Sequence, residues 1–161
     1  MTARGRAPAT EVDDPTVACA CGRLRRAARA LTQLYDDAMA PSGLRVTQFS
    51  LLRTLDRDGP VRISVLAAHL LLDRTALSRN LDPLVARKLV AVTPGRDARS
   101  REVKLTRAGG AELARAVPYW SRAQAAVRER VGAERLDGLI ATLGELESLH
   151  PHLESRTEAA P

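Results

Sequence analysis

The fold of this chain is decided by residues 64–105, which read SVLAAHLLLDRTALSRNLDPLVARKLVAVTPGRDARSREVKL. On either side of Leu71-Leu72, apolar residues recur at the three- and four-residue spacing of amphipathic helices. Ser64 and Asp73 each precede one of these apolar runs and could accept hydrogen bonds from the free amides of a helix's first turn. We therefore expect two short helices joined by a tight bend, the second spanning about residues 74–88.

After the second helix the sequence changes to the pattern of a β-hairpin. A polar tip rich in Gly, Pro, Asp and Ser, residues 93–100, separates two arms. The apolar positions of the two arms are Leu89, Val90, Val92, Val103 and Leu105. Residues 61–63 form a short strand-like link before the first helix. Helix, bend, helix and hairpin predict a winged helix-turn-helix, which is mainly α with a small β-hairpin (α+β).

Long amphipathic helices are expected on both sides of this winged helix. Residues 17–40 carry an apolar stripe with arginines on the other faces, and residues 107–150 carry a second stripe interrupted at Gly132. Thr47 is the expected cap of the helix that precedes the helix-turn-helix pair. Thr106 is the expected cap of the C-terminal segment. Since a winged helix closes its core without such flanking helices, their stripes predict a homodimer contact.

The length of 161 residues predicts one folded domain, residues 16–154, between two tails. The ends of the chain, residues 1–15 and 155–161, lack hydrophobic periodicity, so we expect them to be disordered. Within the domain we expect two dimerisation segments and one winged-helix lobe, at residues 17–40, 107–150 and 46–106 respectively.

The positive charge of the chain is concentrated on the helix-turn-helix and the hairpin. The chain has 25 basic and 19 acidic residues and a formal net charge of +6. Residues 74–107 hold nine basic and three acidic side chains, so this window accounts for the whole excess. These elements could enter DNA grooves. Because aromatic residues make up only 2% of the chain, stacking on single strands is disfavoured, and double-stranded DNA is the expected partner.

Other classes of function find little support in the sequence. The chain has no apolar run of about 18 residues and no signal-peptide pattern, so we expect a cytoplasmic protein without a membrane partner. It has no glycine-rich phosphate loop, no zinc-protease or serine-hydrolase motif and no catalytic carboxylate pair, so we expect neither an enzyme nor a cofactor nor a metal site. A nonspecific architectural DNA-binding protein is the alternative, because basic charge alone gives nonspecific affinity.

Several stretches resemble the MarR family of winged-helix bacterial transcription regulators, over roughly residues 17–150. They are Gly43 to Phe49, Arg74 to Leu81 and the hairpin, where Asp97-Ala98-Arg99-Ser100 and Leu105 to Gly109 are the most specific. The resemblance implies a sequence-specific transcriptional regulator that binds double-stranded DNA. It further implies a homodimeric repressor of a palindromic operator, released by a small ligand or by thiol oxidation.

The resemblance also implies which residues contact DNA: Arg74, Thr75, Ser78, Arg79, Arg99 and Arg101. Arginine forks bind guanine edges or phosphates, and short hydroxyls reach bases or phosphates. Arg99 is expected in the minor groove, where a narrow A·T-rich stretch concentrates negative potential. Asp97 is expected to support the wing by orienting Arg99 or Arg101.

The signal that the protein senses has weaker sequence indications. Cys19-Ala20-Cys21 begins the first helix, where peptide dipoles favour a reactive thiolate, so both cysteines are candidate redox sensors. Metal capture with a histidine and plain partial burial at the dimer contact are the alternatives. The resemblance implies a small aromatic or phenolic effector as the other type of signal. No motif identifies its site, although four residues could line a crevice for it: Arg45, Tyr35, Phe49 and Trp120.

Overall fold

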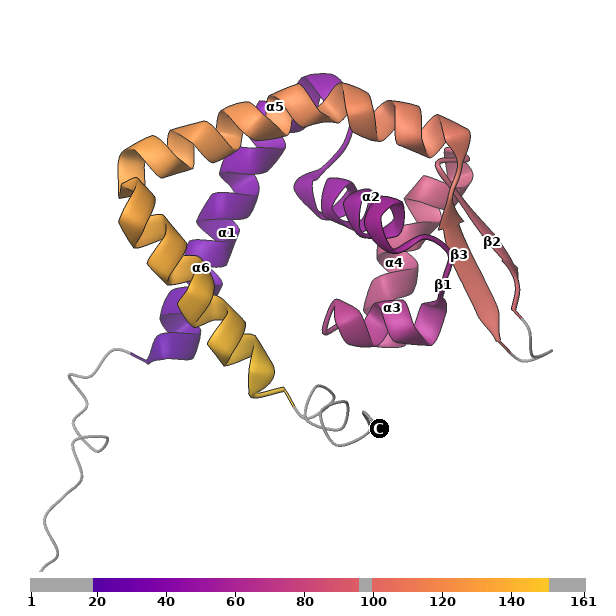
Figure 1. Ribbon diagram of the computed structural model, residues 1–161, viewed down its shortest axis with the longest axis horizontal. Helices are drawn as coiled ribbons and strands as arrows, with labels where there is room; N and C mark the ends of the chain where they lie inside the picture. Colours follow the sequence, from indigo (N-terminus) through magenta and orange to yellow (C-terminus); the bar gives the residue numbers. More distant parts are fainter. Residues whose placement is uncertain (1–18, 96–99, 151–161) are drawn as a thin grey trace, which may run out of the picture. The chain divides into compact units, whose positions relative to one another are not determined.

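The computed structural model of this chain describes residues 19–95 and 100–150 (Figure 1). Its helices and strands are, in order, α1 (Ala20–Met39), the 3-10 turn η2 (Ala40–Ser42), α2 (Val46–Asp58), β1 (Val61–Arg62), α3 (Ile63–His69), α4 (Arg74–Ala86), β2 (Val90–Pro94), β3 (Arg101–Leu105), α5 (Arg107–Val131) and α6 (Ala133–Ser148). The tails predicted at residues 1–15 and 155–161 lie outside the described residues.

The chain divides into two compact units, Met1–Gln33 and Leu34–Pro161. In the first unit, the described residues begin at Cys19 and form the start of α1. The arginines of this segment are exposed, as expected for the polar faces of an amphipathic helix: Arg23, Arg25, Arg26 and Arg29. The helix predicted over residues 17–40 is α1, and its first two predicted residues lie outside the described ones.

The second unit contains the winged helix-turn-helix that the sequence predicts. Helices α3 and α4 are joined by a bend at which Leu71 takes a positive φ of 51°. The wing is the antiparallel pair β2 and β3, and β1 joins it in the order β1-β3-β2. Val103 of β3 pairs with Val61 on one side and Val92 on the other, and it is fully buried. The strand-like link at residues 61–63 is therefore a true strand over its first two residues.

The core of the second unit lies between the winged helix and the first half of α5. Its largest fully buried side chains come from α2, α3, α4 and β3 together with the residue that ends α1: Phe49, Leu51, Leu52, Leu55, Leu66, Leu77, Leu84, Val103 and Met39. Leu113 and Ala116 of α5 close this core. The helical spacing of three and four that predicted these helices also determines which of their faces is buried.

Two of the four predicted helix caps are correct. Asp73 Oδ1 accepts a hydrogen bond from the Ala76 amide at 2.7 Å at the start of α4. Thr106 Oγ1 accepts one from the Gly109 amide at 3.0 Å at the start of α5. Both caps act within one turn of helix, so the local sequence was enough to find them.

The caps predicted at Thr47 and Ser64 are wrong. The residue that precedes α2 is Arg45, two residues before the predicted cap, and α2 begins at Val46, whose amide donates to Asp36 Oδ1 of α1 at 2.7 Å. Helix α3 begins at Ile63, directly after β1, and no side chain caps it. At the start of α2 the Asp36 contact from α1 stands beside a local one, in which the Arg45 amide donates to Gln48 Oε1 at 3.1 Å, and α3 begins where β1, paired with β3, ends.

The end of α4 is fixed to the start of α5 by backbone contacts. The Thr106 amide donates to the Leu89 carbonyl at 3.1 Å, and Thr106 Oγ1 lies 2.8 Å from the Lys88 carbonyl oxygen. Gly109 is buried against the backbone of Leu89. The two strands of the wing therefore begin and end close together, since β2 follows α4 and β3 precedes α5. Figure 1 shows the wing at the N-terminal end of α5.

Candidate nucleic-acid interface

Helix α4 presents its polar face to solvent. Its three buried leucines, Leu77, Leu81 and Leu84, anchor the opposite face in the core. The four residues of α4 that were predicted to contact DNA are all exposed: Arg74, Thr75, Ser78 and Arg79. Because residues four apart lie on one side of a helix, they form two adjacent pairs along the solvent-facing side.

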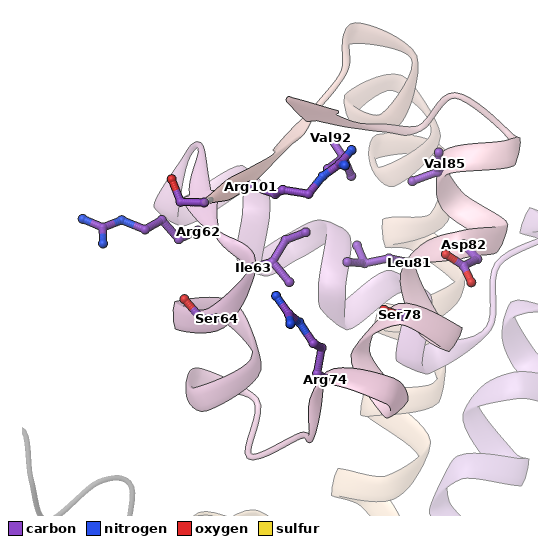
Figure 2. Close-up of a pocket in the computed structure, with 11 residues that line it drawn as sticks. Arg62, Ile63, Ser64, Arg74, Ser78, Leu81, Asp82, Val85, Val92 and Arg101 are labelled. Atoms are coloured by element: carbon purple, nitrogen blue, oxygen red, sulfur yellow. The ribbon is translucent and has the colours of Figure 1, made fainter. Parts of the chain in front are cut away.

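A cleft of about 660 Å³ lies between α4, the start of α3 and the sheet (Figure 2). Its polar lining comes from separate elements of the winged helix: Arg62 and Ser64, Arg74, Ser78 and Asp82, and Ser100 and Arg101. Figure 2 shows Arg74 rising from α4 toward Ile63, whereas Arg62 extends outward from β1. The lining contains three arginines and one aspartate, so it favours an anionic partner.

The structure brings three of the predicted DNA-contacting residues together. Arg74, Ser78 and Arg101 line the same cleft, although they come from α4 and β3. Thr75 and Arg79 are exposed on α4 but do not line it. The two wing residues of the prediction, Arg99 and Asp97, lie outside the described residues.

The sequence interpretation missed Arg62 and Ser64 as part of this surface. The sequence patterns predict Ser64 as a helix cap and Arg62 as part of a strand-like link. The available signal was the alternation of Val61 with Arg62, since a strand that buries one residue turns the next one outward. Register confirms this alternation, because Val61 pairs with buried Val103 and Arg62 with the neighbouring Glu102.

Comparison with known proteins identifies the family. The family model described as MarR family matches residues 42–100. The crystal structure of the M. tuberculosis transcriptional regulator MosR in complex with DNA is 44% identical, covers 82% of this chain and 98% of that chain, and has a TM-score of 0.72. The chain belongs to the MarR family.

Other solved members of the MarR family agree with this assignment. A second crystal structure of the M. tuberculosis transcriptional regulator MosR is 41% identical, over 82% of this chain and 97% of that chain, with a TM-score of 0.70. The transcriptional repressor CouR, bound to a 23-mer DNA duplex, is 29% identical over 80% of this chain and 92% of that chain, with a TM-score of 0.72. No curated protein matches the chain.

One basic residue of the counted window in this MarR-family chain is paired within the protein. Arg87 was counted in the basic window of residues 74–107, but its Nη2 lies 2.7 Å from Glu112 Oε1 of α5. Its Nη1 donates to the Gly43 carbonyl at 2.8 Å. The guanidinium thus has partners within the protein while 39% of its side chain stays exposed, and Glu112 is shared with Arg115.

Helices α5 and α6 of the second unit expose large apolar side chains. Those at least 40% exposed are Val117, Leu139, Ile140, Leu146 and Leu149, and Leu149 is 70% exposed. Four of them lie on α6 or directly after it, where Leu136 is the one buried residue of the helix. Such a stripe on a single chain is typical of a surface that meets another protein. Among the described residues, no helix has the length and apolar character needed to cross a membrane.

The two cysteines of this MarR-family chain are exposed free thiols in the first unit. Cys19 directly precedes α1, and its carbonyl accepts a hydrogen bond from the Arg23 amide at 3.1 Å. Cys21 lies in the first turn of the helix. Across residues 19–95 and 100–150, no three His, Cys, Asp or Glu side chains gather as they would around a metal ion.

Two of the three aromatic residues considered for an effector crevice, Phe49 and Trp120, stack on one another. Phe49 is 1% exposed, and its ring stacks on Trp120 at 5.7 Å between centroids. The guanidinium of Arg53, which sequence reasoning missed, lies 4.8 Å from the Trp120 centroid. Tyr35 donates a hydrogen bond to Gln124 of α5, and burial raises the pKa of its hydroxyl. Phe49 therefore belongs to the core rather than to an open surface.

Proposed function

We propose that this chain is a sequence-specific transcriptional regulator that binds double-stranded DNA, and that it acts as a homodimeric repressor of a palindromic operator. The observation that carries the proposal is the cleft at which Arg74, Ser78 and Arg101 meet, on the exposed side of α4 and the wing. The MosR and CouR structures, each solved with DNA, support it.

In this proposal α4 is the recognition helix. It has 13 residues, or about 20 Å at the helical rise, and the major groove of about 12 Å admits one helix. Arg74, Thr75, Ser78 and Arg79 all lie in its first half, which contacts base edges in helix-turn-helix proteins. Arg101 binds the flanking phosphates, and Arg99 enters the minor groove with Asp97 as its support.

The second subunit is proposed to cover the apolar residues of α5 and α6. Leu139, Ile140 and Leu149 are between 42% and 70% exposed in one chain, and a two-fold dimer buries such a stripe against its own copy. The two recognition helices then face half-sites about one helical turn of DNA apart, about 34 Å. A palindromic operator follows from this symmetry.

Release from DNA is proposed to follow either thiol oxidation or the binding of a small aromatic or phenolic ligand. Cys19 and Cys21 are the candidate redox sensors, because both thiols are exposed at the start of α1, where an oxidant reaches them. The proposed role of the protein is binding rather than catalysis, as in the regulators that it resembles. Because its target is chromosomal DNA, the protein is placed in the cytoplasm.

A footprint on the DNA upstream of the protein's own gene tests the proposal. The expected result is one protected palindrome with two half-sites about 10 base pairs apart, centre to centre. Protection without sequence preference would instead support a nonspecific architectural protein, whose affinity comes from charge alone. Absence of protection at protein concentrations up to the micromolar range would contradict DNA regulation altogether.

A further inference from the structure

A buried carboxylate joins the end of the recognition helix to α5. Glu112 lies in the second turn of α5 and is only 7% exposed. Its Oε1 accepts a hydrogen bond from Arg87 Nη2 at 2.7 Å, and its Oε2 accepts one from Arg115 of the same helix. A carboxylate this far out of water is tolerated when its charge is paired, and Arg87 is the partner that comes from outside α5.

Arg87 connects three segments through one planar group. It is the residue directly after α4, and its Nη1 donates to the Gly43 carbonyl at 2.8 Å, in the turn that precedes α2. A guanidinium presents its donors in fixed directions, so two partners on different segments restrict where it can lie. The end of α4, the turn before α2 and the second turn of α5 are thereby held at one point.

The ion pair is only half-buried, since the side chain of Glu112 is 9% exposed and that of Arg87 is 39% exposed, and such a pair is weak evidence for stability. The pair does restrict the direction of α4 relative to α5. Thr106 joins the residues after α4 to the start of α5 through hydrogen bonds to the Lys88 and Leu89 carbonyls, and all of them are made by one residue at the N-terminal end of α5. Arg87 and Glu112 add a contact further along α5, and two points of attachment restrict the direction of α4 relative to α5 more than one does.

We propose that Arg87 and Glu112 are positioning residues that set the direction of α4 relative to α5, and hence the spacing between the two recognition helices of the dimer. This inference rests on the proposed function, because α5 carries part of the surface assigned to the second subunit. Neither residue needs to touch DNA for this role. It follows that the pair governs affinity for a palindrome of the native spacing and leaves nonspecific affinity unchanged.

The opposite charges of the two residues separate this role from a simple electrostatic one. Arg87→Ala removes a positive charge, and Glu112→Gln removes a negative one, so an electrostatic effect would change DNA affinity in opposite directions. Loss of positioning weakens palindrome binding in both variants. Arg115→Ala is the matched control, since it removes the same charge as Arg87→Ala. Arg115 contacts the same carboxylate, but it lies on the same helix as Glu112 and so does not join α5 to α4.

The test is a fluorescence-anisotropy titration on the footprinted palindrome, on that palindrome with one base pair inserted between its half-sites, and on a random duplex. We expect Arg87→Ala and Glu112→Gln to weaken palindrome binding about tenfold or more, and to change random-duplex binding less than about threefold. The inserted base pair should cost these variants less than it costs the wild type. Arg87→Lys should recover part of the loss, and Arg115→Ala should stay within about threefold of wild type.

Tighter palindrome binding by Glu112→Gln, or equal losses for Arg87→Ala and Arg115→Ala, would overturn the proposal. If Arg87→Ala fails to fold, as circular dichroism would reveal, Glu112→Gln and Arg87→Lys still decide the matter because both keep the side-chain volume. A wild-type protein that binds no palindrome would contradict the proposed function. A wild type that binds one, with variants that bind it equally well, would contradict this inference alone.

Discussion

Substitution of Gly109 by alanine tests the junction between the wing and α5, and a matched control lies next to it in the sequence. A Cβ at residue 109 would overlap the Leu89 carbonyl oxygen, and would lie 2.8 Å from Leu105 Cδ1 and 3.0 Å from the Leu89 carbonyl carbon. At Gly110 the nearest atom to a new Cβ is Leu105 Cδ2 at 3.9 Å, which is an ordinary contact. The two residues share one helix and differ mainly in this space.

The expected change in the free energy of unfolding is the difference between two opposing effects. Alanine in place of glycine inside a helix stabilises it by about 0.5–1 kcal/mol. Overpacking costs about 1–3 kcal/mol, and the upper end applies at residue 109 because the clash is with backbone, which cannot rotate away. We therefore expect Gly109→Ala to lower the free energy of unfolding by about 2 kcal/mol, and Gly110→Ala to raise it by about 0.5–1 kcal/mol.

Thermal unfolding followed by circular dichroism measures both effects. For a protein of this size, about 2 kcal/mol corresponds to a melting temperature lower by about 4–8 °C. Gly110→Ala should raise it by about 1–4 °C. The reasoning is refuted if Gly109→Ala is as stable as Gly110→Ala, because α5 would then not approach the Leu89 backbone as closely as described.

Three further predictions concern the caps and the thiols. Asp73→Ala removes the acceptor of the Ala76 amide and should cost about 1 kcal/mol in urea unfolding, whereas Asp73→Asn should cost a few tenths; equal losses would argue against the cap. Asp36→Ala removes the partner of the Val46 amide and should also cost about 1 kcal/mol, and an unchanged midpoint would show that water replaces the carboxylate. Replacing Cys19 and Cys21 together by serine should leave DNA affinity unchanged and abolish its loss on peroxide treatment, and intact peroxide release would rule out both thiols as sensors.

The winged helix could be predicted from the sequence because its signals are local. The change from helical spacing to alternation near Leu89, and the caps at Asp73 and Thr106, act within a few residues. The starts of α2 and α3 were misplaced because they depend on Asp36 and on the strand pairing of Val61, which lie in other segments.

In the candidate site, too, local features could be predicted from the sequence and contacts between distant segments could not. Arg74, Ser78 and Arg101 were assigned to DNA contact from the family resemblance, and the structure shows that all three line one cleft. The contact between Arg87 and Glu112 spans 25 residues, and no periodicity in the sequence relates the two. Charge counting assigned Arg87 to the DNA-facing surface because a sequence gives the number of charges but not their internal partners.

The central claim is that the exposed side of α4 and the wing binds operator DNA, and its most direct test is the affinity of Arg74→Ala and Arg101→Ala for the footprinted palindrome. Each variant should bind more weakly by about 1–3 kcal/mol, with a salt dependence lowered by about one counterion where a phosphate contact is lost. Arg115→Ala, on the exposed side of α5, should bind within about threefold of wild type. Wild-type affinity in both Arg74→Ala and Arg101→Ala, or an equal loss in Arg115→Ala, would contradict the account.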